Sequence, residues 1–301
     1  MKYNFKRFMF SITAVSILLA SGILFAAGQT SESFKMKVGK FEIIALLDSE
    51  IEMNASLVKN GDPAIIKQYM PAGKASCSIN AFVVKTGKLN ILIDSGMGES
   101  KFGNGKLLKN LKKADINPED IDIILITHGH FDHVGGLVKD GKPVFSKAKL
   151  MFSKKEITTF DDKAISKLPA DVKGYYEPAN AALKAYKGRI ETFTPGSKIA
   201  EGVSSVEMYG HTPGNVGFLF ESSGETFFML GDLLHIAPLQ FPHPEISLVY
   251  DTDTVKSARM RSKILNWASS KKFIVAGSHI QFPGIGMVKK EKTGFSFSPV
   301  K

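Results

Sequence analysis

The chain has 301 residues, of which 44% are hydrophobic and 23% are charged, as in an ordinary globular protein rather than a disordered or fibrous one. Its single cysteine excludes an intramolecular disulfide, a Cys₄ zinc site and a Cys-x-x-Cys redox centre, so histidine and carboxylate must hold any metal. The net charge is +10, but the lysines are scattered and form no arginine-rich or aromatic-interleaved stripe, so nucleic acid is not an expected partner.

The first 28 residues have the features of a secretory signal peptide. Three basic residues within the first seven positions precede an apolar run from Phe8 to Ala20, and small residues follow at 26–28. An uncleaved membrane anchor is the alternative, because an apolar stretch of about 20 residues can span a bilayer. Interspersed serines and threonine favour cleavage, which removes three positive charges and leaves residues 29–301 with a net charge of +7. We therefore expect one periplasmic or secreted domain without stable membrane insertion.

Strands dominate the first part of this domain and alternate with helices later. The run 121–126 is almost continuously apolar, which is typical of a strand buried on both faces, and it leads directly to His128. β-Branched and aromatic residues predict strands at 41–47, 79–85, 89–93, 121–126, 149–152, 204–209, 216–220, 226–230 and 273–276.

Helical spacing of apolar residues predicts the remaining elements. One helix is expected around residues 107–111, and three more are expected at 154–160, 175–186 and 254–268. Residues 161–174 combine paired aspartates with a proline and a glycine, so they are predicted to form a loop or lid insertion.

Three imidazoles and a carboxylate lie within six residues after the buried strand. His128, His130, Asp132 and His133 form the pattern His-x-His-x-Asp-His, interspersed with glycines that permit tight turns. Imidazole nitrogen and carboxylate oxygen suit zinc and similar borderline cations. A single histidine is more often structural, but three histidines and an aspartate within six residues at a strand end predict a metal site.

This pattern resembles the signature of the metallo-β-lactamase superfamily, in which a more distant His, Asp and His follow. Here these are His211 in Gly-His-Thr-Pro-Gly, Asp232 in Leu-Gly-Asp-Leu and His279 in Gly-Ser-His, each after a predicted strand. The resemblance extends over essentially the whole mature chain. It implies an α/β fold of four layers, αββα, with two central sheets between helices. It also implies two divalent cations, with zinc expected and Mn, Co, Fe or Cd as alternatives.

Carried over residue by residue, the resemblance implies seven metal ligands. Two divalent cations about 3.5 Å apart can share a hydroxide that attacks the substrate, and Asp132 or a bound water would return the proton. Asp94 matches a turn whose carboxylate orients a ligand histidine. His235 and His243 are not expected to bind metal. The implied ligands are His128, His130 and His211 for one cation, Asp132, His133 and His279 for the other, and Asp232 as the bridge.

A narrower resemblance connects the chain with the methyl parathion hydrolase branch. Segments 282–286 and 294–297 resemble this branch, whose members hydrolyse phosphotriesters, lactones or aryl esters, often as secreted dimers. A small-molecule substrate and a homodimer are therefore implied. Phe102, Phe160 and Tyr175 match the aromatic residues that line its leaving-group pocket. The second of these positions is Trp and the third is Phe in the best-known member, which leaves the substrate open.

Other activities have to be weighed against this ester, lactone or phosphotriester hydrolase. An acyl-homoserine lactonase needs an acyl groove, whereas the aromatic positions favour a leaving-group pocket. A β-lactamase opens a cyclic amide, and a thioesterase of the glyoxalase II kind has a C-terminal helical domain that the tail after His279 is too short to supply. A non-catalytic metal-binding protein is disfavoured by the complete ligand set. Cys77 is expected to be a packed residue or a free thiol without a catalytic role.

Overall fold

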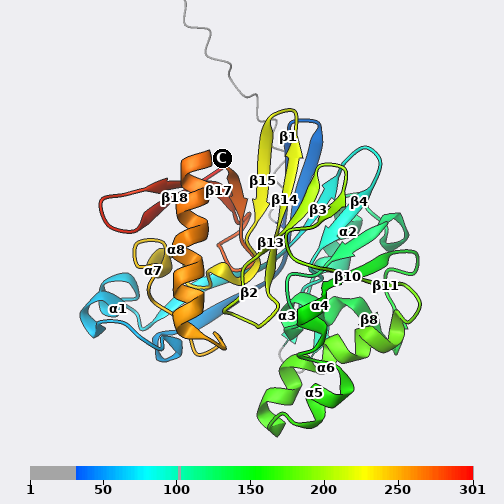
Figure 1. Ribbon diagram of the computed structural model, residues 1–301, viewed down its shortest axis with the longest axis horizontal. Coiled ribbons are helices and arrows are strands. Elements are labelled where there is room, and N and C mark those ends of the chain that lie inside the picture. Colours follow the sequence, from blue (N-terminus) through cyan, green and yellow to red (C-terminus); the bar gives the residue numbers. More distant parts are fainter. Residues whose placement is uncertain (1–31, 101–102, 301) are drawn as a thin grey trace, which may run out of the picture.

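Two seven-stranded sheets form the centre of the molecule (Figure 1). The computed structural model describes residues 32–100 and 103–300. In hydrogen-bonding order the first sheet contains β1 (Ser33–Val38), β2 (Phe41–Asn54), β3 (Lys74–Lys85), β4 (Asn90–Ile93), β7 (Ile123–Leu125), β10 (Lys149–Ser153) and β11 (Ile190–Phe193). The second contains β12 (Lys198–Ala200), β13 (Val203–Glu207), β14 (Val216–Ser222), β15 (Glu225–Met229), β16 (Ile274–Ala276), β17 (Ile285–Lys290) and β18 (Phe295–Pro299).

Helices and two short ribbons connect these strands. The ribbons pair β5 (Glu99–Ser100) with β6 (Gly103–Asn104), and β8 (Val138–Lys139) with β9 (Lys142–Pro143). The α-helices of the described residues are α1 (Pro63–Tyr69), α2 (Leu107–Lys113), α3 (Phe131–Val134), α4 (Lys154–Ile157), α5 (Asp162–Ser166), α6 (Ala170–Ala185), α7 (Ala237–Gln240) and α8 (Thr254–Lys271).

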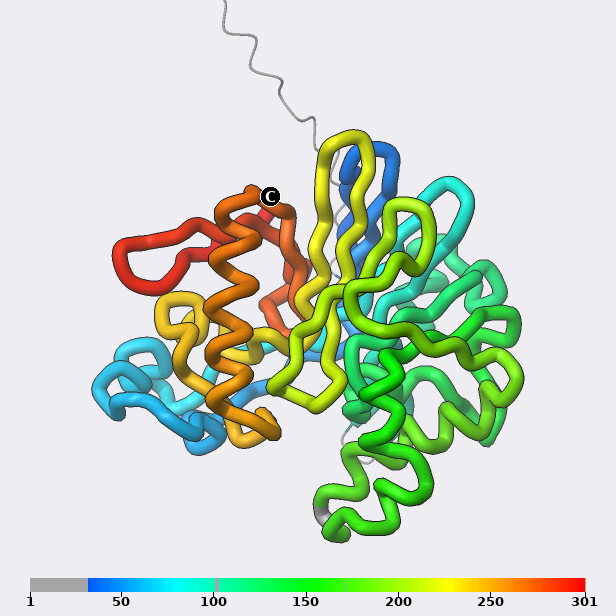
Figure 2. Tube along the Cα trace, viewed as in Figure 1, coloured from blue at the N-terminus to red at the C-terminus, as the bar shows by residue number. Residues whose placement is uncertain are grey.

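Apolar side chains fill the spaces between four layers. Phe82 of β3 and Phe227 of β15 meet between the two sheets, with ring centroids 6.2 Å apart. Leu111 of α2 and Ala182 of α6 belong to a second cluster, which covers the outer face of the first sheet. Leu265 of α8 belongs to a third cluster on the outer face of the second sheet, where Figure 2 shows the helix running along the strands. The predicted αββα arrangement is therefore confirmed.

Parallel pairing brings several strand ends to one edge. β7 pairs in parallel with β4 on one side and with β10 on the other, and β15 pairs in parallel with β16 in the second sheet. All three residues of β7 are buried, as its apolar sequence predicts. Since the carboxyl ends of parallel strands meet at one edge of a sheet, the loops that follow β7, β15 and β16 can converge.

Each predicted strand is present, but the helical segment after β10 differs from its prediction. Residues 161–174 are not a loop: they contain α5 and the beginning of α6. The Asp161 side chain accepts the Ala164 N–H at 2.7 Å and caps α5, and Pro169 stands just before the first turn of α6. The aspartate and proline that suggested a loop therefore act as helix-start residues. The sequence pattern does not predict β17 or the edge strands β1, β11, β12 and β18.

The predicted signal peptide, residues 1–28, lies outside the described residues. Its cleavage and the site of export stay predictions. Among the residues that the structure describes, no helix is long and apolar enough to cross a membrane.

Candidate metal centre

The candidate ligands lie in four loops that follow strands of the two sheets. His128 and His130 follow β7, and Asp132 and His133 lie in the short helix α3 directly after them. The other three come from the second sheet: His211 between β13 and β14, Asp232 after β15 and His279 after β16.

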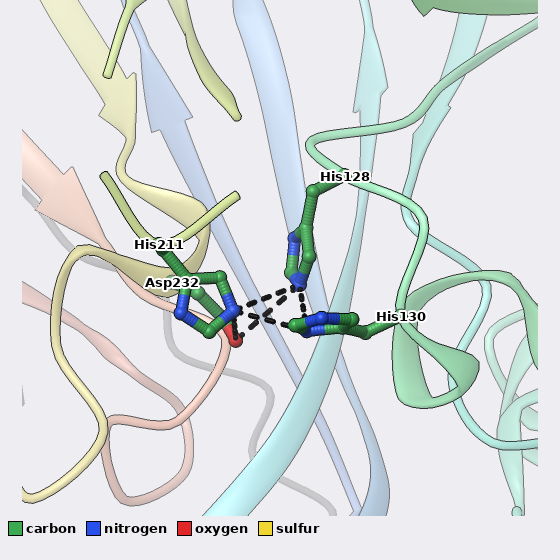
Figure 3. A group of neighbouring side chains, drawn as sticks. All are labelled: His128, His130, His211 and Asp232. Atoms are coloured by element: carbon green, nitrogen blue, oxygen red, sulfur yellow. Dashed lines mark hydrogen bonds and ion pairs between the residues drawn. The ribbon is translucent and has the colours of Figure 1, made fainter. Parts of the chain in front are cut away.

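The first group brings three imidazole nitrogens together around one point (Figure 3). His128 Nε2 lies 2.9 Å from His130 Nδ1. His211 Nε2 lies 3.2 Å from His128 Nε2 and 3.0 Å from His130 Nδ1. Asp232 Oδ2 completes the group, at 3.3 Å from His211 Nε2 and 3.6 Å from His128 Nε2. Four ligand atoms thus face one another, as a tetrahedral cation site requires.

The second group lies beside the first and shares Asp232 with it. Asp132 Oδ2 lies 3.6 Å from His133 Nε2 and 3.3 Å from His279 Nε2. Asp232 Oδ1 faces His133 Nε2 at 3.2 Å, and Asp232 Oδ2 faces His279 Nε2 at 3.2 Å. The structure therefore brings all seven candidate ligands together, with one carboxylate between the two groups.

The chemistry of these side chains fits two divalent cations. Their donors are imidazole nitrogens and carboxylate oxygens, which zinc and related metals accept. His133 Nε2 and Asp232 Oδ1 are buried and face each other at 3.2 Å, but neither atom forms a hydrogen bond with a described residue. Because buried polar atoms without hydrogen bonds are costly, a cation between these two atoms would stabilise both.

The electrostatics of the centre separate neutral imidazoles from charged ones. Burial and the neighbouring His211 lower the pKa of His130 to about 3, and burial and His133 hold the pKa of His128 well below its usual range. Burial also opposes the charged form of His279, but Asp232 and Asp132 outweigh it and raise the pKa of this imidazole to about 10. In the absence of metal, the His128 and His130 imidazoles are therefore neutral, whereas His279 carries a proton beside the carboxylates of Asp232 and Asp132.

Each candidate ligand imidazole has a partner for the nitrogen that points away from the cluster. His133 Nδ1 donates to Asp94 Oδ2 at 2.8 Å, so the predicted contact between this carboxylate and a ligand histidine is confirmed. Asp94 also accepts from the backbone and the hydroxyl of Thr127, and its φ of 57° is unusual for a residue other than glycine. The remaining partners are Thr127 Oγ1 for His128 (3.1 Å), the Tyr176 hydroxyl for His130 (3.1 Å), Asp251 Oδ1 for His211 (3.2 Å) and the Ser78 carbonyl for His279 (3.1 Å).

A buried glutamate that the sequence did not single out joins two of the ligand loops. Glu156 Oε1 accepts the Gly129 N–H at 2.9 Å, between the first two ligand histidines. Its Oε2 accepts the Thr212 hydroxyl at 2.7 Å and the Gly214 N–H at 2.9 Å, in the loop of His211. Burial raises the pKa of this carboxyl group, although the hydrogen bonds act in the opposite direction. Glu156 therefore holds the loops of the first group in register.

A buried arginine supports the same group from α8. Arg261 donates to the Leu233 carbonyl at 2.6 Å, one residue after Asp232, and lies 3.4 Å from Asp251 Oδ2. Asp251 in turn accepts from His211 Nδ1. Neither Arg261 nor Glu156 belongs to a local sequence pattern, because other charged residues stand beside each of them in its helix. Only their burial distinguishes these two residues from those neighbours.

A cavity of about 170 Å³ opens onto the ligands. Its other walls are Ile51, Met53, Phe131, Tyr175 and Tyr250. Tyr175, which is predicted to line the substrate pocket, thus lies on the wall of this cavity.

The two other predicted pocket residues do not join Tyr175 on this wall. Phe102 lies outside the described residues. The placement of Phe160 in the pocket is wrong: this side chain is fully buried in the core and packs on Phe152, with ring centroids 5.2 Å apart. It lies behind Gly129, where an added Cβ would come within 2.5 Å of its ring. Phe160 thus packs against the ligand loop from the side of the core.

His235 and His243, which were not expected to bind metal, have different surroundings. His235 lines the cavity, stacks on His279 with ring centroids 5.0 Å apart, and places Nε2 3.1 Å from Asp232 Oδ2. With Asp232 and His279 it forms a third set of neighbouring ligand atoms. His243 instead contacts Glu245 at 3.1 Å and the ring of Tyr69.

Two solved structures are similar to this chain over most of its length. The hydrolase AbOPH of the β-lactamase superfamily has a TM-score of 0.84 and 33% sequence identity, and the comparison covers 91% of this chain and 99% of that one. AidC, a dizinc quorum-quenching lactonase in complex with the product N-hexanoyl-L-homoserine, has a TM-score of 0.81 and 28% identity over 90% of this chain and 98% of its own.

Sequence comparison with curated proteins and families gives a consistent result. A metal-dependent hydrolase of Thermoplasma volcanium is 30% identical over 168 residues, which cover 54% of this chain and 64% of that protein. The chain thus spans less than two thirds of this relative. The family model of the metallo-β-lactamase superfamily matches residues 76–279, a range that contains all seven candidate ligands. This chain therefore belongs to the metallo-β-lactamase superfamily, whose fold it shares.

Proposed function

We propose that this protein is a dinuclear zinc hydrolase that cleaves ester, lactone or phosphotriester bonds of small molecules. The observation that supports this most strongly is the position of Asp232, whose two oxygens face ligand atoms of both groups. A single carboxylate between two sets of nitrogen and oxygen donors suits a pair of cations better than one. The superfamily membership supports metal-dependent hydrolysis as the reaction class.

Under this proposal the seven ligands have the roles implied by their grouping. Two bound cations would supply a water of lowered pKa as nucleophile and would polarise the substrate oxygen. His128, His130 and His211 would hold one, Asp132, His133 and His279 the other, and Asp232 would bridge.

The side chains around the cations have roles of their own in this proposal. The outward hydrogen bonds, such as that from His133 Nδ1 to Asp94, keep the ligand nitrogens free of protons and hold the rings in place. Asp132 is partly exposed to the cavity, so its carboxylate is placed to pass a proton to the leaving oxygen. Ile51, Met53 and Phe131 make this part of the cavity apolar, which limits the access of competing water.

The aromatic walls support a substrate with a flat or cyclic group. Tyr175 and Tyr250 line the cavity beside Phe131, and such rings pack well against an aryl leaving group or a lactone ring. The methyl parathion hydrolase branch, suggested by the segments at 282–286 and 294–297, is consistent with that arrangement.

An acyl-homoserine lactonase is the second candidate, because AidC shares 28% identity and a TM-score of 0.81 with this chain. The two candidates differ in what the pocket must accommodate. An aryl ester or phosphotriester hydrolase needs room for a flat leaving group, whereas an acyl-homoserine lactonase needs an additional groove for the acyl chain. Loss of activity as the acyl chain is lengthened would favour the first candidate, and a gain would favour the second.

We further propose that the protein is exported, with residues 1–28 removed, and that it forms a homodimer. The basic and apolar pattern of the N-terminal segment supports export. N-terminal sequencing of protein from the periplasm or medium tests cleavage, and light scattering of the purified protein tests the dimer. Protein found only in the cytosol with Met1 retained would contradict export.

The deciding experiment combines metal analysis with a substrate panel. We expect about two metal ions per chain, and a ratio well below one after supplementation would contradict the dinuclear centre. The panel contains aryl phosphotriesters, γ- and δ-lactones, aryl esters and β-lactams. Turnover of any of the first three classes well above that of β-lactams supports the proposal, whereas a preference for β-lactams would overturn it.

A further inference from the structure

We propose that Tyr176 is a positioning residue of the metal centre: its hydroxyl accepts the N–H of His130 Nε2 and thereby directs His130 Nδ1 toward the first cation. The inference rests on the ligand assignment proposed above and adds a residue of α6 to the support of that centre. Tyr176 is not part of any motif in the sequence and belongs to none of the ligand loops.

The geometry of His130 requires an acceptor at the position of Tyr176. His130 directs Nδ1 into the cluster, 2.9 Å from His128 Nε2 and 3.0 Å from His211 Nε2 (Figure 3). A ring that binds a cation through Nδ1 carries its proton on Nε2. That N–H is in a mostly buried place, where an unpaired donor is costly. The Tyr176 hydroxyl lies 3.1 Å from Nε2 and can accept it.

His130 differs from the other ligand histidines in how it is held. His128, His133, His211 and His279 each direct Nε2 into the cluster. Their Nδ1 atoms contact a residue just after a strand, a backbone carbonyl within β3 or a carboxylate in the loop before α8. His130 is reversed, and its outer partner comes from a helix 46 residues further along the chain. The orientation of this ligand therefore depends on the placement of α6.

Tyr176 is itself well held. Its side chain is 7% exposed and belongs to the core cluster beneath α6, together with Ala179 and Ala182 of the same helix. Its ring lies against that of His130, with centroids 5.1 Å apart. The preceding residue, Tyr175, faces the cavity instead. One turn of α6 thus contacts both the space proposed for the substrate and a proposed metal ligand.

The test measures metal affinity rather than turnover. Metal-free protein competes with a chromophoric chelator for Co²⁺, and the visible spectrum of the bound Co²⁺ reports its coordination. Tyr176→Phe retains the ring and removes only the hydroxyl. We expect it to lower the affinity for Co²⁺ at the first group by about 10-fold, because partners of ligand histidines have effects of that size. The spectrum of the first Co²⁺ should change, and circular dichroism should show a folded protein.

Tyr186, which follows α6, serves as the control. Tyr186→Phe removes an equally buried hydroxyl, which donates to the Leu137 carbonyl and accepts the Phe145 N–H. Tyr186→Phe should lower the stability of the protein without lowering its affinity for Co²⁺. It therefore distinguishes a positioning role from a general structural one.

The outcomes distinguish this inference from the proposed function. If Tyr176→Phe binds Co²⁺ as wild type does, whereas His130→Ala loses one ion, the inference is wrong and the ligand assignment stands. If His130→Ala still binds two ions with wild-type affinity, the ligand assignment itself fails. If Tyr186→Phe weakens the first ion as much as Tyr176→Phe does, the effect is structural and the inference is overturned.

Discussion

The ligand loops and the helical segment 154–185 contribute to the centre in different ways. The loops follow buried strands of two packed sheets and carry all seven candidate ligands. The helical segment carries no candidate ligand in this cluster, yet Glu156 joins two of the loops, Tyr176 contacts His130 and Tyr175 lines the cavity. Figure 1 shows that α5 and α6 project from the body of the molecule.

This difference suggests a division of labour. Ligands must hold their positions closely, and loops anchored at the ends of buried strands provide that rigidity. The helical segment supplies none of these ligands and contacts the centre through the side chains of Glu156, Tyr175 and Tyr176. We therefore expect changes in the loops to abolish the chemistry, and changes in the helical segment to alter substrate preference, metal affinity or stability.

The largest effect is expected for Asp232→Asn in the ligand loops. The substitution removes the negative charge that faces both groups, so both metal positions should weaken. Even partners of ligands alter affinity or activity by 10- to 100-fold, so we expect kcat/KM to fall by more than about 100-fold. Metal analysis and kinetics on a substrate from the panel measure the effect. Asp162→Asn, at an exposed carboxylate of α5, is the control, and equal losses in the two variants would contradict the assignment.

Tyr175→Ala tests the helical segment as the wall of the cavity. Removing the ring takes away an apolar contact with the substrate, and such contacts contribute about 1–3 kcal/mol to discrimination. We expect KM for an aryl substrate to rise by about 10-fold or more, with kcat changing less and metal content unchanged. A variant with unchanged KM for every substrate in the panel would show that Tyr175 does not contact the substrate.

Glu156→Gln tests the connection between the two regions. The amide would direct N–H groups toward a hydroxyl or backbone N–H that now donates to the carboxylate, leaving buried donors unpaired. We expect the free energy of unfolding to fall by about 1–3 kcal/mol in urea titrations. Glu177→Gln, at an exposed glutamate of α6, should change it by less than about 0.5 kcal/mol. Similar changes in the free energy of unfolding for both variants would mean that the contacts of Glu156 with the two ligand loops do not stabilise the protein.

The pH dependence of the Tm of metal-free protein tests whether His279 in the second group is protonated. The folded pKa of His279 is about 10, above the ordinary value of about 6.5. A raised folded pKa stabilises the protein fully below the unfolded value, and this contribution is lost as the pH rises toward the folded value. We therefore expect the Tm with chelator present to fall between pH 6.5 and 10, and His279→Gln to reduce that slope. Equal slopes in wild type and variant would contradict this expectation.

The smallest effect on activity is expected for Cys77→Ala. Burial raises the pKa of this thiol to about 12, so it is protonated at neutral pH and is a poor nucleophile. The thiol donates to the His235 carbonyl at 3.1 Å and packs in an apolar cluster, so its removal lowers stability slightly. We expect kcat/KM to stay within about twofold of wild type. A folded but inactive variant would show that Cys77 takes part in the reaction.

Local pattern accounts for what could be predicted of this protein from its sequence. The run 121–126 and the histidines that follow it indicated both a buried strand and a metal site, because hydrophobic periodicity and ligand spacing are properties of neighbouring residues. The later ligands were found because each stands in a short motif after a predicted strand. The layers of the fold came from the family resemblance rather than from the periodicity.

The tertiary structure decided which isolated residues support the site. Glu156, Tyr176 and Arg261 have no pattern around them, and their roles follow from contacts with residues 10 to 58 positions away. The same reason explains the error at Phe160, which lies in the turn after α4 and packs its ring in the core instead of the cavity. Ligand type and order are local properties of the chain, whereas the direction of a side chain depends on the packing of distant elements.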